Sequence, residues 1–148
     1  MINLNNKIPR ILVVGDLIID KYLWGSCERI SPEAPVQIVN VENESNSLGG
    51  AGNVLKNLKA LGADTDIISV IGDCSASKEI LGMFQDINVS TDYIINQINR
   101  KTSKKTRILS SQQQVVRFDQ ESTDDISLSS QKKLINTFKN IFKKYDLI

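Results

Sequence analysis

The amino-acid sequence predicts an α/β fold in which an incomplete parallel sheet is flanked by helices and carries a small β lid. Two apolar runs, 11–14 and 67–71, each stop at a Gly-Asp pair and suit strands buried on both faces of a parallel sheet. Segments with helical periodicity, 52–61 and 75–87, alternate with these runs, as parallel crossovers require. A half-exposed strand at 36–42 indicates a second, smaller sheet.

Composition narrows the class of protein. The chain has 148 residues, of which 41% are apolar and 24% charged, which suits one globular unit with one core. A net charge of +1 produces no field that would attract nucleic acid or anionic lipid, so we expect neither nucleic acid nor a membrane as partner. The first ten residues lack the apolar stretch of a secretory signal, which predicts a cytoplasmic protein.

Residue usage also limits the chemistry. The sequence contains no histidine, which excludes Ser-His-Asp catalysis and His-ligated zinc within this chain. The two cysteines, Cys27 and Cys74, lie far apart and are interpreted as reduced thiols. We expect no metal site.

The first half of the chain begins with the strand 11–14. Two prolines within 29–35 exclude both helix and central strand, so an extended excursion is expected there. The alternation at 36–42 shifts by one residue, which indicates a bulge. The helix at 52–61 should stop at Gly62 and point four apolar side chains inward: Val54, Leu55, Leu58 and Leu61.

The second half continues the alternation. After the strand 67–71, Ser75 can cap a helix whose inward residues are Ile80, Leu81, Phe84 and Ile87. Short strands are expected at 91–95, 106–109 and 115–119, separated by polar turns at 99–105 and 110–114. A helix at 129–144 should bury Leu134, Ile135, Phe138, Ile141 and Phe142, and a strand should begin at 146–148. A strand started but not paired predicts a truncated domain.

The run Gly49-Gly50-Ala51-Gly52-Asn53 predicts a ligand-binding turn at the head of a helix. Glycines allow close backbone approach, and the helix directs its first amides and positive dipole end to the same place. A P-loop is excluded because no Gly-Lys-Ser/Thr follows, and a dinucleotide site is disfavoured by Leu55 and by the polar stretch 42–47. Asn53 can bracket sugar hydroxyls or, alternatively, serve only as a helix cap.

Charged residues provide further candidates. Asp16 and Asp20 follow the first buried strand, where open α/β sheets bind ligands, and either carboxylate can accept sugar hydroxyls or merely cap a turn. Basic residues gather around two of the short strands, and in a cleft they could hold a substrate phosphate: Lys101, Lys104, Lys105, Arg107 and Arg117. From this group we select Lys105, Arg107 and Arg117 as substrate-binding candidates.

Over its whole length the chain resembles the PfkB or ribokinase family of sugar kinases. The glycine signature is matched by Gly49, Gly50, Ala51, Asn53, Gly62 and Gly72, whereas Leu55 stands where a small residue is usual. Three segments are similar to the bacterial heptose 7-phosphate kinases of this family: Val14-Gly15-Asp16 with Asp20, Arg29-Ile30-Ser31-Pro32-Glu33-Ala34-Pro35-Val36, and Gln112-Gln113 with Arg117-Phe118-Asp119.

The resemblance implies a ribokinase-like fold and an activity. The reaction is ATP-dependent phosphorylation of the anomeric hydroxyl of D-glycero-D-manno-heptose 7-phosphate, on the route to ADP-heptose and the lipopolysaccharide core. The sugar would be held by Asp20, Gly49, Gly50 and Asn53. The family's catalytic aspartate, in a Gly-Ala-Gly-Asp turn, and its ATP pocket have no counterpart in this sequence.

Residues 1–148 are therefore expected to be the N-terminal substrate-binding part of the kinase domain, with lid strands at about 22–48. This part should be inactive alone. The resemblance implies that the complete enzyme uses ATP and Mg²⁺, neither bound by this chain alone, and forms a homodimer through its lid strands. Two alternatives stay open: a non-catalytic sugar-phosphate-binding or interaction module, and an adenosine- or fructose-type kinase of the same family.

Overall fold

A computed structural model describes residues 7–111 and 113–148, and this part of the chain forms two sheets and three α-helices. In chain order the elements are β1 (Arg10–Val14), β2 (Leu17–Ile30), β3 (Gln37–Gly50), α1 (Ala51–Ala60), β4 (Asp64–Gly72), α2 (Ser75–Asp86), β5 (Ile94–Gln97), β6 (Ser103–Ser110), β7 (Gln113–Gln120) and α3 (Leu128–Ile141). A 3-10 turn, Phe142–Lys144, follows α3.

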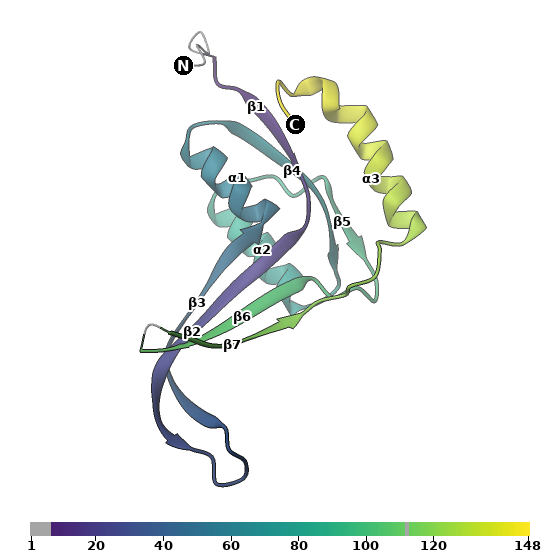
Figure 1. The fold of residues 1–148 in the computed structure, drawn as a ribbon. Helices are drawn as coiled ribbons and strands as arrows, with labels where there is room; N and C mark the ends of the chain where they lie inside the picture. The colour runs from purple at the N-terminus through teal and green to yellow at the C-terminus, as the bar shows by residue number, and fades with distance from the viewer. Residues whose placement is uncertain (1–6, 112) are drawn as a thin grey trace.

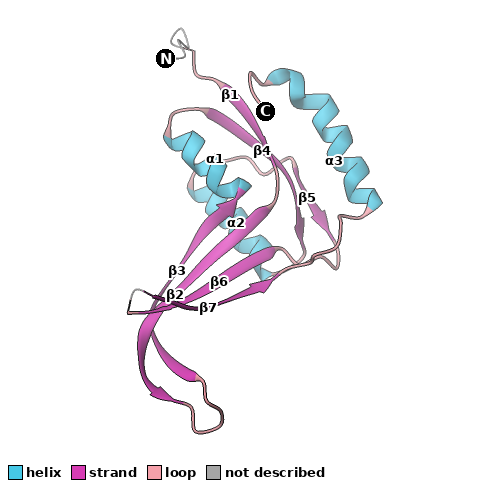
Figure 2. Cartoon of the chain, in the orientation of Figure 1, coloured by secondary structure: helices cyan, strands magenta, loops and turns pink. Residues whose placement is uncertain are grey.

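The first sheet has three parallel strands in the order β1-β4-β5. Helices cover both of its faces, with α1 and α2 on one side and α3 on the other (Figures 1 and 2). Val13 and Ile67 pack with Leu55 and Phe84 under α1 and α2, while Leu12 and Ile68 pack with Ile141 under α3. The predicted α/β fold with a helix-flanked parallel sheet is confirmed.

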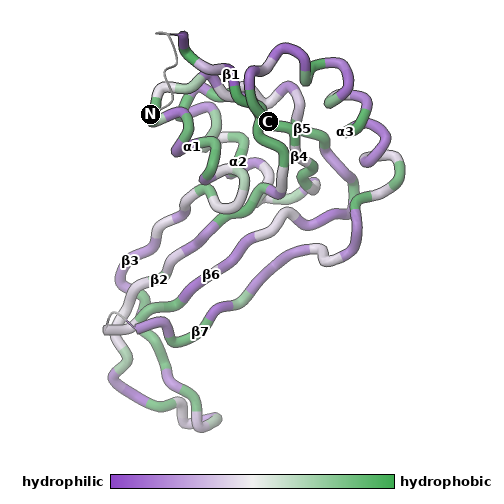
Figure 3. Tube along the Cα trace, turned by 45° about the horizontal axis from the view of Figure 1, so that its top comes forward, coloured by the Kyte–Doolittle hydropathy of each residue, from purple (hydrophilic) through white to green (hydrophobic). Residues whose placement is uncertain are grey.

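The second sheet has four strands in the order β3-β2-β6-β7, and only its β2–β6 pairing is parallel. Its long β2–β3 hairpin projects away from the helices, with the proline-containing segment at its tip (Figure 1). Hydrophilic residues are frequent along β3, β6 and β7 where they leave the helices (Figure 3). Ile19 and Leu48 nevertheless belong to the same core as α1 and α2, which anchors one end of this sheet.

A bulge was predicted at 39–42 and is confirmed. Trp24 pairs with Asn43 and Gly25 with Val41, so Glu42 is the extra residue on β3. The sequence pattern missed further parts of this sheet. The polar stretch 42–47 lies within β3, and 103–105, expected as a turn, begins β6. The turn expected at 110–114 is shorter than predicted, because Ser110 ends β6 and residues 113–114 begin β7. These residues are strands because backbone pairing with a neighbouring strand outweighs the weak strand preference of polar residues.

The helices differ in several details from those predicted from the sequence. Val54 and Leu61, predicted to face inward, are 50% and 84% exposed, and Ile135 is 40% exposed, because α1 and α3 bury narrower stripes than the pattern suggested. Cys74, not Ser75, occupies the N-cap position of α2, and no side chain there makes a capping hydrogen bond. Gly62 has φ +89° and ends α1 as expected. Strand β5 starts three residues later than 91–95.

The end of the described chain returns to the parallel sheet. Leu147 forms a parallel bridge with Ile11, on the edge of β1 that β4 leaves open, which confirms that a strand-like segment begins near 146. Tyr145 secures this segment by donating a hydrogen bond to Asp66 at 2.6 Å. Among the described residues, no helix combines the length and apolar character needed to span a bilayer.

Leu61 provides a direct test of which side chains of α1 are buried. Replacing Leu61 with Lys should change the free energy of unfolding by no more than about 0.5 kcal/mol, because the side chain is already 84% exposed. Leu58→Lys is the matched control and should be clearly destabilising, since Leu58 packs against the core. Urea unfolding of both variants measures the difference, and equal destabilisation would show that α1 buries the stripe predicted from the sequence.

Candidate functional site

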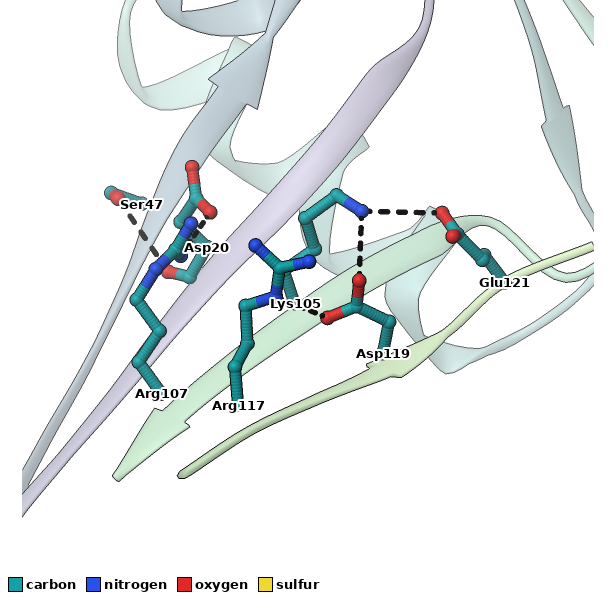
Figure 4. A network of polar contacts seen from close by, with 7 residues as sticks. All are labelled: Asp20, Ser47, Lys105, Arg107, Arg117, Asp119 and Glu121. Atoms are coloured by element: carbon teal, nitrogen blue, oxygen red, sulfur yellow. Dashed lines mark hydrogen bonds and ion pairs between the residues drawn. The ribbon is translucent and has the colours of Figure 1, made fainter. Parts of the chain in front are cut away.

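One face of the four-stranded sheet gathers most of the predicted site residues. The strand register places Asp20, Lys105 and Asp119 in one row across β2, β6 and β7, with Tyr22, Arg107 and Arg117 in the next row. Residues paired across neighbouring strands point to the same side of a sheet. We call this side, with Asp20, Lys105, Arg107, Arg117, Asp119 and Glu121, the charged face (Figure 4).

Each cation of the charged face has a carboxylate partner. Arg107 Nη1 lies 2.5 Å from Asp20 Oδ1, and Arg117 Nε lies 3.1 Å from Asp119 Oδ1. Lys105 Nζ contacts Asp119 at 3.0 Å and Glu121 at 3.5 Å. The face therefore carries three positive and three negative groups that neutralise one another.

These contacts shift the protonation equilibria. The hydrogen bond from Lys105 lowers the pKa of Asp119, and the same bond raises the pKa of Lys105. The hydrogen bond to Asp20 raises the pKa of Arg107. All of these shifts favour the charged forms, so the pairs persist at neutral pH and the Asp119 contact is lost only as the pH falls through the lowered pKa of its carboxyl group.

Asp20 is positioned by Gly49 as well as by Arg107. Gly49 is buried at the end of β3, and a Cβ atom there would collide with Asp20 Oδ2. Glycine at this position therefore lets the Asp20 carboxylate lie against the backbone that leads into the helix. Gly50, with φ +54°, is the N-cap residue of α1, and a Cβ on it would lie 2.6 Å from the carbonyl oxygen of Asp16, so glycine there allows the helix to start close to the segment after β1.

The start of α1 differs in part from expectation. Gly49 and Gly50 end β3, and the helix follows directly at Ala51, whose amide donates to the Asp16 carbonyl at 2.9 Å. One first-turn amide is therefore already engaged. Asn53 is not the N-cap, so its interpretation as a helix cap is wrong; its side chain is exposed and accepts a long hydrogen bond from Asn57 at 3.4 Å.

The predicted basic cluster is divided by strand alternation. Lys104 points to the opposite face of β6, where its ammonium contacts Glu79 of α2 at 3.3 Å. Glu79 also accepts a hydrogen bond from Asn46 of β3, so one carboxylate ties α2 to two strands of the sheet. Lys101 is exposed and lies ahead of β6. Only Lys105, Arg107 and Arg117 share a face with Asp20.

A polar cleft of about 520 Å³ adjoins the charged face. Its walls come mainly from the segment after β1, the segment before β6 and the segment after β7: Asp16, Leu17, Arg100, Lys101, Thr102, Ser103, Glu121, Ser122, Thr123, Asp124, Asp125 and Ile126. Glu121 links the two regions because it also pairs with Lys105. Asp16 therefore lies in the cleft, whereas Asp20 lies on the open sheet face beside it.

Sequence reasoning did not assign Asp119 and Glu121 to the site. Residues 115–119 were predicted as a strand, but this prediction could not show that Lys105 lies opposite Asp119. Tyr22 was also missed; its ring stacks on Trp24 at 5.5 Å and lies 5.4 Å under the Arg107 guanidinium. Gln112, part of the family resemblance, lies outside the described residues.

A metal site requires several donor side chains close together. Across residues 7–111 and 113–148, no three His, Cys, Asp or Glu side chains converge in a way that could hold a metal ion. The charged face has two carboxylates near Lys105, but that ammonium occupies the space between them. These carboxylates are therefore engaged by Lys105 and are not arranged around a metal ion.

The fold and the site define a class of protein: an α/β domain with a polar sheet face beside the carboxyl ends of parallel strands, where such folds bind small ligands. Comparison with known families specifies it further. Residues 9–144 match the model of the pfkB family carbohydrate kinases, and the chain belongs to this family.

Relatives and solved structures agree with this assignment. The chain is 57% identical to the bifunctional protein HldE of Aliarcobacter butzleri over 97% of its own length and 30% of that relative's length. A carbohydrate kinase from Agrobacterium tumefaciens superposes with a TM-score of 0.61 at 24% identity, over 76% of this chain and 36% of that one. The ribokinase of Giardia lamblia superposes with a TM-score of 0.63 at 15% identity, over 88% of this chain and 42% of that one. The ribokinase-like fold is confirmed, and the chain spans about 30% of its curated relatives.

Proposed function

We propose that this chain is the substrate-binding part of an ATP-dependent kinase that phosphorylates the anomeric hydroxyl of D-glycero-D-manno-heptose 7-phosphate. The observation that carries the proposal is the shared position of one carboxylate, Asp20, and three cations on a single sheet face. A sugar phosphate needs both an acceptor for its hydroxyls and cations for its phosphate. The charged face offers both within neighbouring rows.

The sugar ring would lie over the row that contains Asp20. Its hydroxyls would donate to the Asp20 carboxylate, which the backbone of Gly49 approaches closely, and Asn53 in the first turn of α1 would add an amide donor and acceptor. Arg107 and Arg117, directly paired on β6 and β7, would hold the 7-phosphate, with Lys105 beside them. This assigns the substrate-binding role to Asp20, Gly49, Gly50, Asn53, Lys105, Arg107 and Arg117.

The choice of a heptose phosphate among sugars rests on the segment 29–36 and on HldE relatives that are 43–57% identical. The segment lies at the tip of the β2–β3 hairpin, from the last residues of β2 into the following loop. An unphosphorylated substrate such as adenosine or fructose would offer no anion to Arg107 and Arg117, whose charges would then be balanced by Asp20 and Asp119 alone. The route to ADP-heptose and the lipopolysaccharide core, in the cytoplasm, is part of the same proposal.

The remaining functions are proposed to lie outside these 148 residues. ATP use follows from membership of a kinase family. The ATP pocket, bound Mg²⁺ and the catalytic aspartate would belong to the part of the longer relatives that this chain does not cover, and a homodimer would form through β2 and β3 in the complete enzyme. Phosphoryl transfer depends on positioned electrostatic groups of this kind. The chain alone should therefore bind substrate and show no turnover in a magnesium-dependent kinase assay.

The test is calorimetric titration of the chain with D-glycero-D-manno-heptose 7-phosphate, using two variants of the same helix. Asn53→Ala should weaken binding about fivefold, because a hydrogen bond of about 1 kcal/mol is lost. Asn57→Ala is the matched control and should change the affinity by less than about twofold, since among the described residues its side chain makes a single hydrogen bond, the long one to Asn53.

Four results would contradict parts of the proposal. No binding to the unmodified chain would refute the substrate, and equal effects of the two variants would remove Asn53 from the site. Turnover by the isolated chain would show that its catalytic groups lie within these residues. Binding of heptose 7-phosphate with no gain of activity when the remaining part of a relative is added would favour a non-catalytic sugar-phosphate-binding module.

A further inference from the structure

We propose that Arg107 couples recognition of the substrate phosphate to the availability of Asp20. Without a ligand, the Arg107 guanidinium occupies the Asp20 carboxylate; a phosphate monoester draws the guanidinium away and frees the carboxylate for the sugar hydroxyls. This inference rests on the proposed function and deepens it. As a consequence, the site prefers phosphorylated to unphosphorylated sugars more strongly than direct attraction between the phosphate and a cation would achieve alone.

The pairing of Arg107 with Asp20 is diagonal. In the register of β2 and β6, Arg107 lies opposite Tyr22, and the residue opposite Asp20 is Lys105. Lys105 turns instead towards Asp119 and Glu121, at 3.0 and 3.5 Å. Arg107 fills the resulting position by extending one row along the sheet, over the Tyr22 ring, to reach Asp20 Oδ1. Its contact with Asp20 is thus made by the side chain reaching away from its own row.

The alternative position of Arg107 lies towards β7. Arg107 and Arg117 are direct cross-strand partners, and like charges in such positions repel. A phosphate held between them would replace this repulsion with two charge-assisted contacts, and a guanidinium matches phosphate oxygens with two parallel hydrogen bonds. A phosphate dianion also carries more charge than the single Asp20 carboxylate, so it competes well for Arg107.

Release of Arg107 changes what Asp20 can accept. Its Oδ2 atom faces Gly49, while Oδ1 is engaged by Arg107, and the side chain is only 22% exposed. A neutral sugar must therefore compete with an existing ion pair for Oδ1, whereas a sugar phosphate removes the competitor itself. Because coupling between two sites is reciprocal, occupancy of the phosphate position must strengthen binding of the sugar, by a factor commonly between about 5 and 150.

Substitution of Arg107 separates coupling from simple attraction. R107M should weaken binding of heptose 7-phosphate yet tighten binding of unphosphorylated heptose by about fivefold or more, because Asp20 is released. R117M is the matched control: Arg117 pairs with Asp119 rather than Asp20, so it should weaken the phosphorylated sugar and leave unphosphorylated heptose within about twofold. Unchanged or weaker binding of unphosphorylated heptose to R107M would overturn the coupling.

A second measurement uses the unmodified chain and decides the question if circular dichroism shows that R107M is unfolded. Titration of unphosphorylated heptose in saturating inorganic phosphate should give a Kd about fivefold lower than in a chloride buffer of equal ionic strength. An equal or higher Kd in phosphate would overturn the coupling while heptose 7-phosphate binding still supports the proposed function. Failure of the unmodified chain to bind either sugar would overturn both.

Discussion

Gly49→Ala is expected to reduce the affinity for D-glycero-D-manno-heptose 7-phosphate about a hundredfold. The added Cβ atom would collide with Asp20 Oδ2, and Ile18 Cβ, at 3.3 Å, limits movement of β3 on the same side. In the ligand-free chain Arg107 holds the other carboxylate oxygen, so the new methyl group already displaces Asp20 before any sugar binds. Loss of a hydrogen bond between the sugar and the Asp20 carboxylate can cost up to about 3 kcal/mol, which corresponds to about a hundredfold in affinity.

Calorimetry of Gly49→Ala beside Gly82→Ala measures this effect. Gly82 lies within α2, and a Cβ there meets no atom within 4 Å, so this variant controls for the substitution itself and should bind the sugar phosphate normally. Circular dichroism confirms that both proteins are folded. An affinity of Gly49→Ala within about threefold of the unmodified chain would mean that the Asp20 carboxylate is not the hydroxyl acceptor.

The parallel sheet and its helices were predictable because their sequence signals are local. Runs such as 67–71 are apolar on both faces, and Leu55, Ile80 and Phe84 recur with the helical period. The depth of burial was less predictable. Leu61 continues the period of α1 but is 84% exposed at the C-cap of the helix, since a pattern records spacing and not the width of the partner surface.

The four-stranded sheet was harder to predict for a physical reason. Strand β6 pairs with β2 across 85 positions of sequence, as Asp20 with Lys105, and no local pattern records such a contact. Most side chains of β3 and β7 face solvent, and the stretch 42–47 of β3 lacks the apolar alternation by which strands are recognised. Asp20, Lys105, Arg107 and Arg117 could be chosen from their chemistry, but the network that joins them depends on register.

The charged face keeps its geometry because the sheet is fixed at its inner end. Glu79 ties β3 and β6 to α2 on the opposite face, and Ile19 and Leu48 enter the core. The outer part of the β2–β3 hairpin has no such support among the described residues. Rigid placement near Asp20 and a free hairpin tip suit a site that holds a ligand at one end and adjusts around it at the other.

Gly72→Ala is expected to lower the free energy of unfolding by about 3 kcal/mol and also to weaken substrate binding. Gly72 ends β4, and a Cβ atom there would overlap the backbone carbonyl of Arg100. The Gly72 amide donates to Thr102 Oγ1 at 2.7 Å, and its carbonyl accepts from Ser77 Oγ at 2.5 Å, so the contact is locked on both sides. The clash must therefore displace the backbone of residues 100–102.

That displacement reaches the site through the chain itself. Strand β6 starts at Ser103, one residue after Thr102, and carries Lys105 and Arg107. Urea unfolding and calorimetry of Gly72→Ala, compared with Gly82→Ala, separate the two effects; the control should gain about 0.5–1 kcal/mol because alanine favours a helix interior. Lost stability with unchanged heptose 7-phosphate affinity would show that the contact between Gly72 and residues 100–102 supports the core alone. Loss of both stability and affinity would show that the position of residues 100–102 also sets the register of β6, and with it the geometry of the charged face.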